Sequence, residues 1–220
     1  FVDAPILMTT RKVNKRGEDS ADQYNARKLD EISRRTGKMI MRVRASHNKP
    51  KDAPDLVPEI LVEDEFKGLK NDLDLCEGAR VLLTSNLWVE AGLMNGAMGE
   101  VKGYMLPQGF DLGSERPELR GPVCVLVEFE NVNLGHDEHG RPRSFFPNEP
   151  EKRNWVPIFR ETAYAKSEEH VARKQFPLTL AWALTVWKAQ GMTLDRARIS
   201  LGNVGAATPG LGYVAVTRVK

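Results

Sequence analysis

The spacing of hydrophobic positions predicts a strand and then a helix at the start of the chain. An unbroken apolar run at 4–9 (APILMT) predicts a short buried strand. Ser20, followed three residues later by Gln23, forms a capping box that predicts the start of a helix with apolar residues on one side. Gly37 predicts the end of this helix, and MIMRV at 39–43 favours a second strand.

From about residue 77 the pattern changes to short apolar runs separated by turns that contain glycine. Four of these runs predict strands: 79–85, 98–104, 122–130 and 154–160. Several short strands without a long helix are typical of a small β-barrel. The segments 106–121 and 131–153 are long and polar, which predicts surface loops, and 48–58 contains three prolines and predicts a connector.

After residue 174 long apolar runs return, with LTLAWALTV, RARISLG and LGYVAVTRV. This return indicates an α/β domain that is interrupted by the barrel. We therefore expect residues 1–75 to form the first part of the α/β domain, 76–165 the barrel insert and 166–220 the second part.

Composition excludes several classes of protein but names no activity. The chain has 220 residues, of which 41% are hydrophobic and 28% charged, which is typical of a globular protein with a real core. The longest weakly polar run, at 178–187, is too short to span a bilayer, and no signal-peptide pattern is visible. Cys76 and Cys124 are too few for a disulfide framework, so we expect an intracellular protein without a membrane partner.

The net charge of +2 conceals opposite charges along the chain. Residues 1–50 carry 12 basic and 6 acidic side chains, 51–170 carry 13 and 23, and 171–220 carry 7 and 1. If the two ends fold together, a basic module that attracts phosphates carries an acidic insert. Chance fluctuation along the chain gives the same counts, so both interpretations remain open at this stage.

Several common catalytic signatures are missing from the sequence. It contains no G-x-x-x-x-G-K-[ST] phosphate loop, no H-E-x-x-H and no cysteine cluster with zinc spacing. His136 and His139 lie in the acidic turn GHDEHG, which we interpret as an exposed polar turn. No metal site is therefore predicted.

The segment 173–202 carries the strongest concentration of candidate functional residues. An apolar run at 178–184 predicts one buried strand, and a polar cluster follows it directly. Because ligands bind at the carboxyl ends of strands in α/β sheets, this cluster is a candidate binding site. The members of this cluster are Thr185, Trp187, Lys188, Gln190 and Gly191. Lys188 and Gln190 suit phosphate oxygens or a nucleotide, and Thr185 suits a nucleic-acid phosphate. For Trp187, stacking on a base and burial are both compatible with the sequence.

A second candidate segment is PGLGYVAVTRVK at 209–220, in which a small apolar run ends at Thr217 and Arg218. Taken alone, an arginine in this position is an ordinary capping or surface charge.

Together, QFPLTLAWALTVWKAQGMTLD and GYVAVTR resemble motifs V and VI of superfamily 1B DNA helicases, and most closely those of the petite-integration-frequency family. The block CEGARVLLTSNLWVEAGLMNGAMGEVKGY, at 76–104, resembles the Src-homology-3-like barrel insert of that family, including Asn86 and Asn95. The segment 4–32 is similar to the strand and helix that open the second RecA-like domain.

The resemblance implies a second RecA-like domain of an ATP-dependent 5′-to-3′ DNA helicase. It implies that Arg218 is an arginine finger and that Gln190, Gly191 and Lys188 couple the nucleotide to DNA. Thr185, Trp187 and Lys188, with Asn86 and Asn95 of the insert, are then expected to contact single-stranded or forked DNA.

The resemblance also implies ATP with Mg²⁺, held mainly by a first RecA-like domain that this chain lacks. We therefore expect the chain to be a fragment of a larger protein, nuclear or mitochondrial among other settings, and inactive alone. The charge pattern adds Arg173, Lys174 and Lys188 as cations expected to strengthen DNA binding.

The sequence departs from the family pattern at two places: Trp187 replaces a histidine, and Gly210-Leu211-Gly212 lacks a usual glutamine. Two alternatives therefore remain. The chain is a non-catalytic nucleic-acid-binding or adaptor module that kept the helicase fold, or its barrel is a protein-interaction module.

Overall fold

The computed structural model describes residues 4–9, 20–48, 61–111, 113, 120–167, 170–192, 194–200 and 210–219. The chain forms two compact units, each described separately below. Unit 1 comprises Phe1–Lys38 and Leu180–Lys220, and unit 2 comprises Met39–Thr179. Unit 1 is thus discontinuous, with unit 2 inserted into it.

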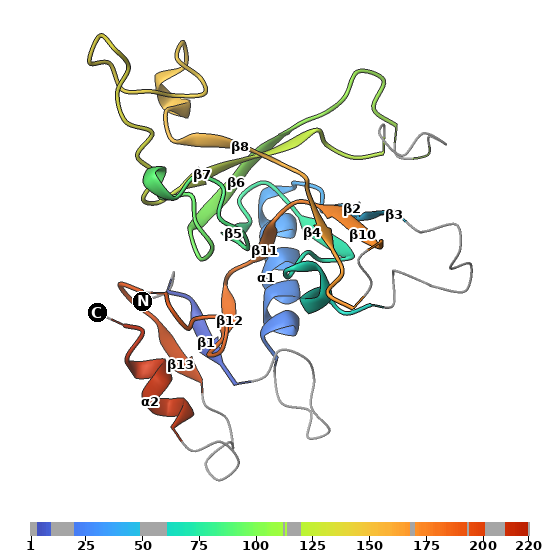
Figure 1. Cartoon of the computed structure of the whole chain (residues 1–220), viewed down its shortest axis with the longest axis vertical. Helices are drawn as coiled ribbons and strands as arrows, with labels where there is room; N and C mark the ends of the chain where they lie inside the picture. Colours follow the sequence, from blue (N-terminus) through green and yellow to red (C-terminus); the bar gives the residue numbers. More distant parts are fainter. Residues whose placement is uncertain are drawn as a thin grey trace. The chain divides into compact units, whose positions relative to one another are not determined.

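Unit 1 is built on a parallel sheet whose strands come from both ends of the chain (Figure 1). β1 (Ile6–Met8) lies in the centre, between β12 (Ala183–Thr185) and β13 (Arg198–Ser200), and pairs with both in parallel. All of β1 is buried, as its continuous apolar run predicts. The predicted strand at 4–9 is therefore confirmed.

Helix α1 (Ala21–Thr36) begins and ends where the sequence predicts. The Ser20 hydroxyl accepts from the Gln23 N–H at 3.2 Å, while the Gln23 side chain accepts from the Ser20 N–H. Gly37 ends the helix at φ 68°, a left-handed conformation that glycine adopts without strain. A second, six-residue helix, α2 (Leu211–Val216), buries Leu211 and Ala215.

One side chain of α1 fixes the edge of this sheet. Asn25 is buried, its Nδ2 donates to the Ala183 carbonyl at 2.8 Å, and its Oδ1 accepts from the Ala183 N–H at 2.8 Å. The amide thereby occupies both backbone groups that a further strand would use. Ile6, Met8, Ala21 and Ala183 pack together as a small buried core of unit 1.

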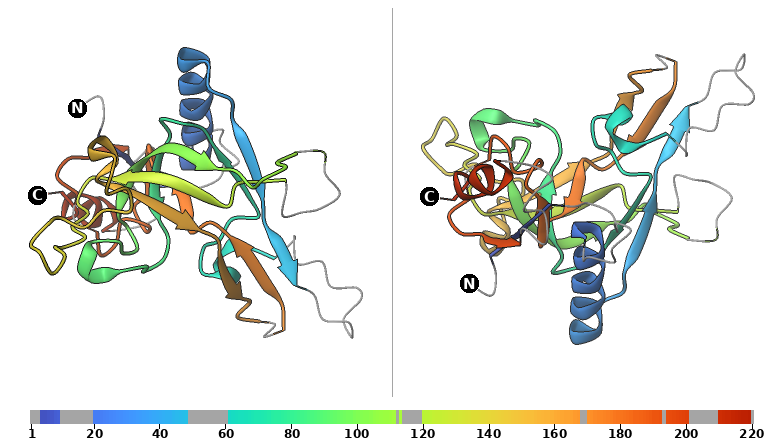
Figure 2. Two further views of the ribbon diagram at one scale, coloured as in Figure 1. Left: turned by 90° about the horizontal axis from the view of Figure 1, so that it is seen from above. Right: turned by 90° about the horizontal axis from the view of Figure 1, so that it is seen from below.

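Unit 2 contains a five-stranded sheet in which β5, β6, β7 and β8 pair antiparallel in sequence order (Figure 2). Its strands are β11 (Leu178–Leu180), β5 (Arg80–Leu83), β6 (Met98–Met105), β7 (Cys124–Phe129) and β8 (Trp155–Phe159). The boundary between the units, at 179/180, falls within β11. All four strands predicted between 79 and 160 are present, shortened or shifted by one or two residues at their ends. Gly99 is required by close packing, because a Cβ there would lie 2.6 Å from the Glu128 carbonyl oxygen.

Two smaller antiparallel sheets complete unit 2. The first runs β3 (Ser46–Asn48), β10 (Ala172–Gln175), β9 (Glu161–Tyr164), and Figure 2 shows the β9–β10 pair beside β3. The second pairs β2 (Met41–Arg44) with β4 (Asp72–Leu75). Short 3₁₀ turns η2 (Glu63–Phe66), η3 (Val89–Ala91) and η5 (Pro150–Lys152) connect the strands.

Two sequence predictions need correction. The apolar lead at 178–184 is not one strand, because it divides into β11 and β12, which belong to different sheets. Arg173 was expected among the cations that face DNA, yet its side chain is 0% exposed and bonds within unit 2. The connector at 48–58 lies almost entirely outside the described residues.

The domain boundaries at 75/76 and 165/166, and the barrel itself, stay predictions. The compact units divide instead at 38/39 and 179/180. Counted over these units, unit 1 carries 14 basic and 7 acidic residues and unit 2 carries 18 and 23. The charge contrast between a basic split module and an acidic insert therefore persists. Among the described residues, no helix is long and apolar enough to cross a membrane.

Candidate functional site

The polar cluster after β12 forms a single helical turn at the carboxyl edge of the parallel sheet. The Thr185 hydroxyl accepts from the Lys188 N–H and the Thr185 carbonyl from the Ala189 N–H, both at 3.1 Å. Thr185 is therefore the N-cap of this turn. The Val186 N–H donates to the Met8 carbonyl at 2.9 Å, which fixes the turn to the end of β1.

This turn separates buried apolar residues from exposed polar ones. Val186 and Ala189 are buried, whereas Lys188 and Gln190 are exposed and Trp187 is 55% exposed. Of the two possibilities that the sequence left open, burial of Trp187 is therefore excluded, and stacking on a base stays a prediction.

Gly191 ends the turn at φ 80°, and an added Cβ would meet nothing within 4 Å. Its left-handed backbone conformation is one that glycine adopts without strain.

The second candidate segment meets the first through the backbone. The Leu194 N–H, just after the turn, donates to the Arg218 carbonyl at 2.7 Å, and Leu194 and Val219 form a parallel bridge. The structure thus places the Arg218 backbone beside Leu194, three residues after Gly191 in the chain.

The Arg218 side chain is half-buried and folded against the end of α2. Its Nε donates to the Val214 carbonyl and its Nη2 to the Thr217 hydroxyl, both at 3.3 Å. A guanidinium has five N–H donors, so these two long contacts leave donors for an anion. Beside it, α2 exposes Tyr213, 76% accessible, and Val216.

Asn86 and Asn95 belong to unit 2 and lie next to each other there. The Asn86 Oδ1 accepts from the Asn95 N–H at 2.8 Å, which closes the loop that contains η3. Both residues line a cavity of about 680 Å³ together with Thr84 and Ser85, which motif reasoning did not single out. The one sequence signal for Thr84 and Ser85 is their position directly before Asn86 in the block at 76–104.

Lys174 is exposed on β10, in contrast to the buried Arg173 beside it. Arg173 Nη1 donates to the Leu69 carbonyl at 3.0 Å and Nη2 to the Leu61 carbonyl at 3.1 Å. Its guanidinium also lies 4.1 Å from the centre of the Phe66 ring. Arg173 therefore stabilises the fold of unit 2.

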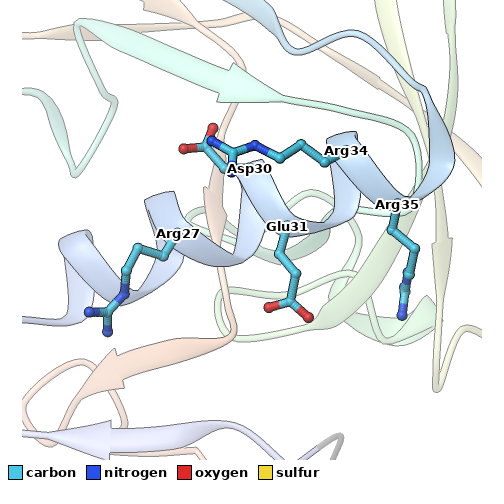
Figure 3. A pocket seen from close by; sticks show the side chains of 5 residues that line it. All are labelled: Arg27, Asp30, Glu31, Arg34 and Arg35. Atoms are coloured by element: carbon cyan, nitrogen blue, oxygen red, sulfur yellow. The ribbon is translucent and has the colours of Figure 1, made fainter.

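A second hollow, of about 570 Å³, lies along α1 (Figure 3). Figure 3 shows Arg27, Glu31 and Arg35 on one side of the helix and Asp30 and Arg34 on another, as their four-residue spacing requires. Glu31 pairs with Lys28 at 2.7 Å, which lowers the pKa of the Glu31 carboxyl. These charges lie on an exposed helix face, and no sequence motif included them.

The described residues contain no group of three His, Cys, Asp or Glu side chains that suits a metal ion. In the turn around His136 and His139, the Asp137 carboxylate accepts from the backbone N–H groups of His139 and Arg141. This carboxylate therefore orders the turn itself.

A parallel sheet with α1 packed against it and a polar turn at its carboxyl edge is typical of an α/β domain, and the RecA-like helicase class fits this arrangement. Human ATP-dependent DNA helicase PIF1 is 32% identical over 203 residues, which cover 92% of this chain and 25% of the human protein. The chain therefore belongs to the Pif1 family of helicases, and it spans about a quarter of the length of this relative.

Solved structures agree on the fold. A Pif1 helicase from Candida albicans superposes with a TM-score of 0.61 at 21% identity, covering 98% of this chain and 43% of that one. A Bacteroides Pif1 helicase in complex with ADP-AlF3 and single-stranded DNA gives 0.50 at 22% identity, covering 99% and 39%. No protein-family model matches the chain.

Proposed function

We propose that this chain is the second motor domain, with its insert, of an ATP-dependent 5′-to-3′ DNA helicase. The observation that carries the proposal is the Leu194–Arg218 backbone bond of 2.7 Å, which holds the two candidate motifs side by side in unit 1. A motor domain needs such a connection, because nucleotide and DNA contacts must move together when the domain moves.

In this proposal Arg218 is the arginine finger. Its guanidinium turns from its two 3.3 Å contacts towards the transferring γ-phosphoryl group and stabilises the negative charge there. Arginine suits this role because its planar fork contacts two oxygens and stays protonated. The exposed Tyr213 and Val216 give a surface beside it that a first RecA-like domain would cover.

The exposed turn after β12 is the proposed site for single-stranded or forked DNA. Trp187 offers a ring for base stacking, which is worth about 1–3 kcal/mol per base. Lys188 offers a cation for the neighbouring phosphate. Gln190 and Gly191 are proposed to couple the nucleotide site to the bound DNA. The net positive charge of unit 1 adds attraction for a polyanion.

ATP requires a phosphate cradle, and the sequence contains no G-x-x-x-x-G-K-[ST] loop to form one. The described residues contain no group of three His, Cys, Asp or Glu side chains that suits a metal ion. We therefore assign Mg²⁺ and most of the ATP contacts to a first RecA-like domain elsewhere in the protein. The 220-residue piece alone is expected not to hydrolyse ATP.

Reading the sequence upstream of Phe1 tests this assignment. A G-x-x-x-x-G-K-[ST] loop followed by an acidic pair is expected there. If the upstream sequence lacks both, the chain is instead a nucleic-acid-binding module that kept the fold without the motor.

A further inference from the structure

The cavity of unit 2 contains two hydroxyl groups that the protein itself does not satisfy. Thr84 is only 7% exposed, and the Oγ atoms of Thr84 and Ser85 are both buried without a hydrogen-bond partner. An unpaired buried hydroxyl costs about 1–3 kcal/mol. Both residues line the cavity of about 680 Å³. Rotation of either side chain about its Cα–Cβ bond would turn the hydroxyl towards a ligand there.

The wall around these hydroxyls is fixed and offers more hydrogen-bonding groups. The Thr84 N–H donates to the Pro177 carbonyl at 2.9 Å, which holds the end of β5 in place. The Asn86 Oδ1 accepts from the Asn95 N–H at 2.8 Å, and both asparagines line the cavity.

The charged side chains that line the cavity balance each other, which favours an uncharged ligand group. The lining includes one cation, Lys67, and one carboxylate, Glu161. Unit 2 as a whole has 18 basic and 23 acidic residues, which disfavours burying a phosphate there. Hydroxyls and amides both donate and accept, and this combination matches the edge of a nucleobase.

We infer that this cavity receives the hydrogen-bonding edge of an unstacked base from a single DNA strand, with Thr84, Ser85 and Asn86 as its contacts. The inference rests on the proposed function, which supplies the strand. Unstacked bases present their Watson–Crick edge, which a stacked duplex conceals. Lys67 also lines the cavity, is exposed and has φ 53°. Its ammonium group can neutralise the DNA phosphate next to the bound base.

The test compares base-bearing and abasic strands on the full-length protein. Single strands of about 16 nucleotides, one each of dA, dC, dG and dT and one abasic throughout, are titrated by fluorescence anisotropy at fixed salt. The variants are Thr84→Val and Ser85→Ala, which remove each hydroxyl and nearly keep its shape. Thr36→Val, at an exposed threonine of α1, is the matched control.

We expect each cavity variant to weaken binding of the preferred base-bearing strand by about three- to tenfold, the worth of one hydrogen bond. Affinity for the abasic strand should stay unchanged, and Thr36→Val should leave both affinities at the wild-type value. Thr84→Val should unfold at the wild-type temperature or above, because it removes an unsatisfied hydroxyl.

Two results would overturn the inference and leave the proposed function standing. One is wild-type affinity of both variants for every strand, which would point to a peptide or other occupant. The other is an equal loss on base-bearing and abasic strands, which would indicate a contact to the DNA backbone. Absence of any single-strand binding by the wild-type protein would instead refute the proposed function, and the inference with it.

Discussion

Replacing Arg173 by methionine tests whether this arginine stabilises unit 2 or binds DNA. The wild-type guanidinium is fully buried and donates to the carbonyls of Leu69 and Leu61 and to His47 Nε2, at 2.9–3.1 Å. It also lies 4.1 Å from the centre of the Phe66 ring.

The size of the effect follows from these contacts. Hydrogen bonds to a charged group contribute about 1.5–3 kcal/mol each, and a desolvated cation–π contact about 2 kcal/mol. Methionine avoids the cost of burying a cation, but it leaves the buried Leu69 carbonyl and the part-buried Leu61 carbonyl without this donor. We therefore expect Arg173→Met to lower the free energy of unfolding by about 3–5 kcal/mol.

The assay is urea unfolding followed by circular dichroism, with hydrogen exchange of the β9 and β10 amides to locate the loss in unit 2. The matched control is Lys174→Met, the exposed neighbour on β10, which should change stability by less than about 0.5 kcal/mol. The reasoning is wrong if Arg173→Met is as stable as the control. It is also wrong if this variant folds normally and weakens binding of single-stranded DNA.

Two further substitutions test unit 1, both measured by the change in thermal unfolding. Asn25→Leu should cost about 2–4 kcal/mol, because it removes two 2.8 Å bonds and leaves the Ala183 N–H and carbonyl without this partner. A loss below about 1 kcal/mol would show that another group satisfies the edge of β12. Gly191→Ala should cost about 1–2 kcal/mol through its backbone alone, since φ is 80° and no atom lies within 4 Å of the added Cβ. An unchanged melting temperature would contradict the left-handed turn.

Local signals in the sequence predicted the elements whose causes are local. The helix at 21–36 was predictable because Ser20, Gln23 and Gly37 determine its ends through contacts within a few residues. The strands of the five-stranded sheet were predictable because apolar runs separated by glycine turns leave few alternatives.

Long-range packing set the features that the sequence did not predict. The apolar run at 178–184 gives no sign that it divides between two sheets, because both halves are equally hydrophobic. Arg173 looks like any surface cation, since its partners lie more than 100 residues away in the chain. The unsatisfied hydroxyls of Thr84 and Ser85 likewise become visible only once the cavity forms.

For the candidate site, the sequence motifs predicted which residues take part but not how they are arranged. Thr185 was predicted to contact a phosphate, and the structure adds that its hydroxyl caps the turn. The bond between Leu194 and the Arg218 carbonyl joins segments that the sequence separates by more than 20 residues.

The most direct test of the central claim is the rate of ATP hydrolysis by the full-length protein with saturating single-stranded DNA. The variants are Arg218→Ala and, as the matched control, Arg196→Ala, an exposed arginine of the same unit. The account predicts that Arg218→Ala lowers kcat by about 10³-fold or more while nucleotide and DNA binding persist, and that the control keeps wild-type turnover. DNA-stimulated turnover of Arg218→Ala within about tenfold of wild type would contradict the assignment of Arg218 as the arginine finger.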